Sequence, residues 1–166
     1  MNTTLTKLLQ HRAISSISHY QNFTINLLSE KPIRGFPSTI KLYLGSDWFL
    51  NGKDWWTDFI MKFPIDTSGM PFPYEPVKAF ALFLLDAEIL DVELSDDNSL
   101  DLHFSNNYIL HIPGKISYPE VSWMNEPEYE KSWLIGAAED SEYEDLEVSC
   151  DGNGKLSVKG IECLLR

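Results

Sequence analysis

An alternation of apolar and polar residues between Leu100 and Ile112 constrains the fold of this 166-residue chain more than any other feature. The apolar positions are Leu100, Leu102 and Phe104, then Tyr108, Leu110 and Ile112. A two-residue loop would send the second set to the opposite face of a sheet. A three-residue loop, Ser105 to Asn107, pairs Phe104 with Tyr108 and keeps all six on one face, with Asn107 in a left-handed conformation.

The flanking patterns predict an α+β fold of antiparallel β-hairpins with a few helices. We expect helices at Thr3–His11, capped by Thr3 or Thr4, and at Val77–Leu85, which begins after Pro76 and is apolar nearly all round, as in the centre of a core. A last hairpin is expected around Asp151–Gly154. Residues 45–73 read as a linker region whose aromatic side chains dock on the core: Trp48, Trp55, Trp56 and Phe59. An exposed binding indole is the alternative for one member of the adjacent pair Trp55-Trp56.

The length suits one domain, residues 1–166, and a faint internal repeat relates residues 8–50 to residues 84–135. If the repeat is real, it implies two similar halves within that domain. The longest apolar stretch, Ala79 to Leu85, is too short to span a bilayer, and residues 1–7 lack the pattern of a secretory signal. We therefore expect a cytoplasmic protein with no membrane partner, whose two cysteines are small, buried or half-buried thiols.

Negative charge is concentrated in residues 120–151, here called the acidic segment. It holds eleven carboxylates and one cation, Lys131, within a chain of net charge −12. Aromatic residues are interleaved with the acids, which is untypical of a disordered acidic tail. Such a field steers a basic partner, although a solvated face is the simpler alternative. The residues expected to contact a partner are Trp123, Glu126, Glu128, Tyr129, Glu130, Glu139, Asp140, Glu142, Tyr143, Glu144, Asp145 and Glu147.

Other chemistries have weaker support in the sequence. The hairpin register places Asp101 opposite His111 on the outer face with His103 nearby, a set that could hold a divalent metal. A polar, solvated face explains it more simply, so we expect no metal, no cofactor and no catalytic residue. The thirteen Lys and Arg residues form no cluster, which disfavours binding to nucleic acid.

Short motifs in residues 84–135 resemble a group of small bacterial immunity-type proteins associated with polymorphic toxins, including contact-dependent growth inhibition systems. The motifs are Leu85-Asp86-Ala87-Glu88-Ile89, Asp91-Val92, the run from Asn98 to Asn106, Ile109-Leu110-His111-Ile112, and Glu128-Tyr129-Glu130 followed by Trp133. The turn has Asn106-Asn107 where that group usually has glycine. The resemblance implies a cytoplasmic, non-enzymatic protein that covers a toxin domain, and many such toxins are basic nucleases.

The sequence thus favours an immunity protein, or antitoxin, that neutralises a basic toxin domain, in the leading case a nuclease, through an acidic and aromatic surface. We expect the protein to be a monomer or weak homodimer. Two alternatives stay open: a metal-dependent hydrolase or other small enzyme that uses the outer-face His and Asp side chains, and a homo-oligomeric structural or adaptor protein.

Overall fold

The computed structural model describes residues 1–31, 34–65, 74–117, 130–138, 142–143 and 145–160. These residues form a mixed α+β structure of antiparallel sheets with three helices. In chain order the elements are α1 (Asn2–Leu9), β1 (Ala13–Tyr20), β2 (Asn22–Leu28), β3 (Thr39–Leu44), β4 (Phe49–Leu50), α2 (Lys53–Ile60), α3 (Glu75–Phe83), β5 (Ile89–Leu94), β6 (Leu100–Phe104), β7 (Ile109–Ile112), β8 (Lys131–Ala137), β9 (Glu147–Asp151) and β10 (Leu156–Lys159).

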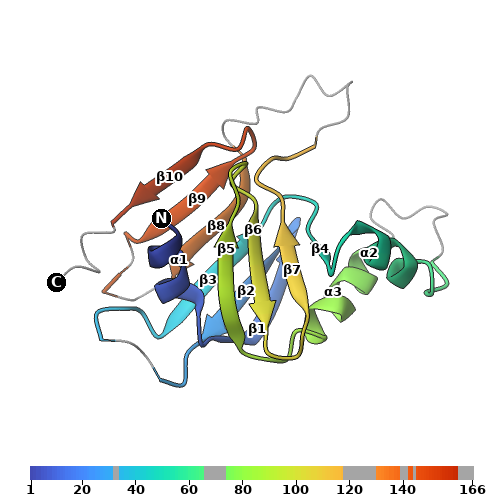
Figure 1. Cartoon of the computed structure of the whole chain (residues 1–166), viewed down its shortest axis with the longest axis horizontal. Helices are drawn as coiled ribbons and strands as arrows, with labels where there is room; N and C mark the ends of the chain where they lie inside the picture. The colour runs from blue at the N-terminus through green and yellow to red at the C-terminus, as the bar shows by residue number, and fades with distance from the viewer. Residues whose placement is uncertain (32–33, 66–73, 118–129, 139–141, 144, 161–166) are drawn as a thin grey trace.

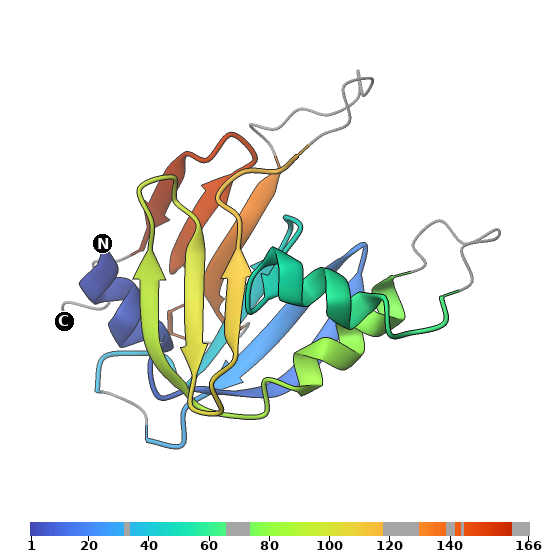
Figure 2. The same cartoon turned by 45° about the vertical axis from the view of Figure 1, so that its right-hand side comes forward.

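The strands form two sheets that face one another (Figure 1). The larger sheet has the order β1-β2-β3-β8-β9-β10, and the smaller has the order β4-β7-β6-β5. Helix α1 lies against β5, whereas α2 and α3 lie beyond β4 and β7 at the other end of the smaller sheet (Figure 2). No helix in the described ranges combines the length and the apolar character needed to cross a bilayer.

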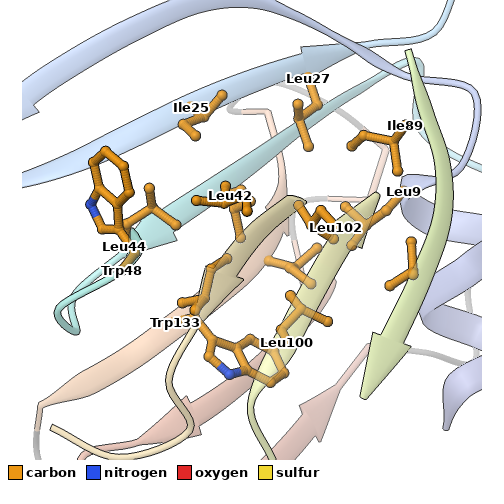
Figure 3. Close-up of a cluster of buried hydrophobic side chains, with 14 of the residues drawn as sticks. Leu9, Ile25, Leu27, Leu42, Leu44, Trp48, Ile89, Leu100, Leu102 and Trp133 are labelled. Atoms are coloured by element: carbon orange, nitrogen blue, oxygen red, sulfur yellow. The ribbon is translucent and has the colours of Figure 1, made fainter. Parts of the chain in front are cut away.

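The core lies between the two sheets because every second residue of the central strands points inward (Figure 3). One apolar row crosses four strands of the larger sheet through the paired residues Ile25, Leu42, Ile135 and Val148. The smaller sheet contributes a second set of fully buried residues: Leu100, Leu102, Leu110 and Ile112. Each sheet therefore buries one face against the other sheet, as expected from strands in which every second residue is apolar.

The register predicted for the β6–β7 hairpin is confirmed. The backbone N–H of Phe104 donates to the carbonyl of Tyr108 at 2.8 Å, and Leu102 lies opposite Leu110. Asn107 has a φ of 68°, the left-handed conformation expected at the end of a three-residue loop. The β9–β10 hairpin also forms where predicted, and Asp151 fixes its turn by accepting the N–H groups of Asn153 and Lys155, each at 2.9 Å.

The helices differ from expectation in three ways. Helix α1 begins at Asn2 and has no side-chain cap, because its N-cap is Met1 rather than a threonine. Helix α2 forms within the segment expected to be a linker. Helix α3 is not central in the core: Phe80 and Phe83 are 50% and 68% exposed, and only one side of the helix packs inward. Its all-round apolar pattern therefore marks a helix with an uncovered apolar face.

The element order has a regularity of its own: a helix followed by three antiparallel strands occurs first as α1-β1-β2-β3 and again as α3-β5-β6-β7. Each unit is followed by a strand that joins the other unit's sheet. Strand β4 pairs with β7, and β8 pairs with β3. The buried Trp48 and Trp133 lie just before or within these exchanged strands. Descent from a duplication remains a prediction.

A candidate partner-binding surface

Seven of the twelve residues predicted to contact a partner lie outside the described residues: Trp123, Glu126, Glu128, Tyr129, Glu139, Asp140 and Glu144. The other five lie around β8 and β9. Glu130 is exposed immediately before β8, and Glu142 and Asp145 are exposed in the connection that follows it. Since β8 has seven residues, these two groups are separated by about 20 Å. The described acids therefore lie at the two ends of one strand rather than in one compact patch.

Glu147 and Tyr143 are the less exposed members of these five. The carboxylate of Glu147 lies 3.7 Å from the ammonium of Lys131 and 3.8 Å from that of Lys159, and it accepts the Ser149 hydroxyl at 2.9 Å. Tyr143 is half-buried and packs against the core. Glu147 and Tyr143 therefore contribute to the structure of the larger sheet, and the charge available to a partner is carried by the more exposed acids.

A second surface, which the charge pattern did not reveal, is formed by α2 and α3. The rings of Trp48, Trp56 and Phe59 are in sequential contact, with centroids 5.5 and 5.7 Å apart. Trp55 stacks on Phe59 at 5.1 Å and meets the edge of Tyr108. The prediction that these aromatic side chains dock on the core is confirmed, and both Trp55 and Trp56 are half-buried rather than one buried and one exposed.

Large apolar side chains remain exposed around this helix pair. Met61, Tyr74, Phe80 and Phe83 are 76%, 42%, 50% and 68% exposed, and all four lie on or beside α2 and α3. Single exposed apolar residues are ordinary, but a group of this size beside aromatic packing is typical of interaction surfaces. We call these four residues the apolar rim.

A cleft of about 690 Å³ lies inside the apolar rim, between the β1–β2 turn, the β3–β4 connection and the two helices. We call it the aromatic cleft. Phe23 and Trp48, whose rings meet at 5.7 Å, lie at its base, and Tyr74 and Met61 lie among its lining. The volume is within the range of clefts that receive small molecules or a few side chains of a partner.

Charged side chains also line the aromatic cleft. The ammonium of Lys78 lies 6.0 Å from the centre of the Trp48 ring and 3.6 Å from the carboxylate of exposed Asp47. One turn earlier on the same helix, Oε2 of Glu75 lies 3.0 Å from Nε2 of His19, but it is buried and has no hydrogen bond within the described chain. The cleft therefore combines an apolar base with charged groups of both signs, and the Trp48 ring already has the Lys78 cation near it.

The outer-face histidines are engaged in pairs. Nδ1 of His111 contacts Oδ1 of Asp101, and its ring packs on Phe49 with centroids 4.5 Å apart. His103 lies 3.8 Å from the carboxylate of Glu93 instead. No group of three potential metal ligands occurs within the described ranges.

Two buried ionisable groups have structural positions. Burial lowers the pKa of Arg12 to about 10, so the guanidinium is charged at neutral pH, and it donates to the carbonyls of Leu8, Pro37 and Ser38. Burial raises the pKa of the Cys150 thiol to about 11, which makes it a poor nucleophile, as expected of a buried cysteine.

No protein-family model, curated protein or solved structure matches this chain.

Proposed function

We propose that this chain is a non-enzymatic immunity-type protein that binds and neutralises a basic toxin domain, in the leading case a nuclease. The observation that carries the proposal is the concentration of charge, since eleven carboxylates and one cation fall within residues 120–151 of a chain whose net charge is −12. A surface evolved only for solubility would have its charge spread and mixed.

The positions of the described acids favour long-range attraction over the coordination of a small ion. Glu130, Glu142 and Asp145 are exposed and are distributed along both ends of β8, so they act together on a broad cationic surface. Charges of this kind chiefly raise the rate of association, and their effect falls as salt shortens the screening length to about 10 Å at 0.1 M.

Affinity also needs groups that are desolvated on contact, and the apolar rim with the aromatic cleft supports this part of the proposal. Phe80 and Phe83 offer apolar area, while the apolar base of the cleft at Phe23 and Trp48 suits an apolar or aromatic side chain from the partner. Aromatic and arginine side chains are the commonest anchors of protein interfaces.

The first test measures electrostatic attraction between the acidic segment and a basic partner. The product of the neighbouring gene is immobilised as the partner, and binding is followed by surface plasmon resonance. Changing Glu130, Glu142 and Asp145 together to Lys should slow association by about tenfold or more at low salt, with a much smaller effect at high salt. The matched control is the change of three exposed acids outside the acidic segment, Glu30, Asp86 and Asp96, to Lys. Equal association rates for the two triple variants would remove the acidic segment from the mechanism.

The second test addresses anchoring. Phe83→Ala should leave association nearly unchanged and speed dissociation about 30-fold, the equivalent of about 2 kcal/mol. Leu90→Ala is the control, because Leu90 is also exposed but lies on β5, away from the helix pair. If both variants dissociate at the wild-type rate, the partner does not use the apolar rim. Failure of the neighbouring gene product to bind at all, within an operon of metabolic enzymes, would favour the enzyme alternative.

A further inference from the structure

The two sheets have four edge strands among the described residues, and three of them have features that oppose pairing with another chain. Strand β4 has only two residues. Strand β10 has four and ends in Lys159. Strand β5 carries Asp91 and Glu93, shifts register after Ile89 and has α1 against it. Short length, charge, irregularity and cover are the usual means by which proteins protect a sheet edge.

Strand β1 differs from the other three edges. Its eight residues, AISSISHY, include no Lys, Arg, Asp, Glu or Pro. The backbone N–H of Ile89 donates to the carbonyl of Arg12 at 2.8 Å just before the strand begins, and near its end the His19 side chain contacts Glu75 of α3 at 3.0 Å. From Ile14 onward its outer side makes no backbone hydrogen bond with any other described residue.

The side chains of β1 are arranged as in a strand that could lie inside a sheet. Opposite β2, Ile17 pairs with Ile25 and faces the core, whereas Ser16 and Ser18 pair with Asn26 and Thr24 on the outer face. The one irregularity lies between Ile14 and Ser16, so the strand is regular from Ser16 to Tyr20. Nothing in this pattern would turn a neighbouring strand away.

We propose that the β1 edge pairs antiparallel with the β1 edge of a second copy of this chain, which joins the two larger sheets into one. An antiparallel register centred on Ile17 places Ser16 of each copy opposite Ser18 of the other and keeps the core-facing residues of both copies on one face. Such an isologous contact is closed: it uses both edges and gives a dimer rather than a fibre.

The dimer is weak, and salt strengthens it. Pairing of seven residues from each copy, Ile14 to Tyr20, buries less than the roughly 1,000 Å² of a stable interface. Each copy carries a net charge of −12, so the copies repel at long range and approach best where their surfaces carry no charge. Screening removes this repulsion. Salt should thus have opposite effects on the two associations, favouring the second copy and disfavouring a basic toxin, so this inference does not depend on the proposed function.

Sedimentation velocity of the full chain tests the proposal, at 20–400 µM protein in about 50 mM and about 500 mM NaCl. The wild type should form dimers that increase with both protein concentration and salt. A variant with Ser16→Lys and Ser18→Lys places like charges opposite one another and should dimerise at least tenfold more weakly. The control, Ser95→Lys with Asn153→Lys, makes the same change in net charge in two exposed turns and should dimerise at least as well as the wild type.

Circular dichroism confirms that each variant is folded. A wild type that stays monomeric at 400 µM in both salts would overturn the proposal, and so would equal dimerisation of the two double-lysine variants. A third outcome, a monomeric wild type whose β1 variant alone loses the toxin partner, would also overturn it, because the edge would then receive a strand of the partner.

Discussion

Arg12 provides the sharpest test of how this fold is held together. Arg12 is 2% exposed, and its guanidinium joins two segments through three backbone carbonyls: the end of α1 at Leu8 and the turn before β3 at Pro37 and Ser38. No carboxylate is paired with it in the described part of the chain. The perturbation is Arg12→Met, which keeps the volume of the aliphatic stem and removes all three donors.

The expected loss follows from two opposing effects. Each buried carbonyl left without a donor costs about 1–3 kcal/mol, and the low end applies here because Arg12 borders a cleft of about 660 Å³ that lets water approach. The carbonyls of Leu8 and Pro37 thus cost about 2 kcal/mol, whereas that of exposed Ser38 keeps the Ser29 N–H at 3.0 Å. Removing a desolvated charge offsets part of this cost. We expect a net loss of about 1 kcal/mol in the free energy of unfolding.

Urea unfolding followed by tryptophan fluorescence measures the effect. With a slope of about 2 kcal/mol per molar, the midpoint should fall by about 0.5 M with the slope unchanged. Lys7→Met is the control, since Lys7 lies exposed on α1 and its loss should change the midpoint little. If Arg12→Met is as stable as wild type or more so, the desolvation of the guanidinium outweighs its hydrogen bonds and the reasoning is wrong.

Three further outcomes are expected. Asn107→Ala should destabilise the protein by about 1 kcal/mol while Asn107→Gly is neutral or stabilising, because only the glycine relieves the positive φ; equal melting curves would contradict this. Leu102→Ala should cost about 2–5 kcal/mol in urea unfolding, against less than about 1 kcal/mol for exposed Leu90→Ala. In a Cys163→Ser background, Cys150 should react with a thiol reagent at pH 8 only at the rate of unfolding, since burial raises its pKa to about 11; rapid labelling of the native protein would show the thiol to be accessible.

The sequence was sufficient to predict local structure where the alternation of apolar residues is compatible with a single strand register. In the β6–β7 hairpin, alternate residues of each strand are apolar, and a three-residue loop places all of these residues on the same face. The structure has the register that this loop length gives. The exposed apolar face of α3 could not be predicted in the same way. A helix that is apolar all round looks the same in sequence whether its second face meets the protein's own core or lies open, as it does at Phe80 and Phe83.

The aromatic cleft illustrates a second limit. Phe23, Trp48 and Glu75 come from β2, the β3–β4 connection and α3, and no spacing in the sequence relates them. The pair Trp55-Trp56 was the only local signal, and it indicated aromatic packing without indicating the cleft. The acidic segment was visible from composition alone, but the position of its described acids at both ends of β8 follows from strand pairing.

The exchange of strands between the two halves also sets an order of events during synthesis. Strand β3 ends at Leu44, and its neighbour β8 begins only at Lys131. At about 5–20 residues per second, the ribosome needs roughly 4–17 seconds to make the intervening chain. Throughout that time the open side of β3 has no native partner. The amino-terminal half therefore cannot complete its sheet as it emerges, and a nascent chain stalled before residue 131 would be a client for chaperones rather than a folded half-protein.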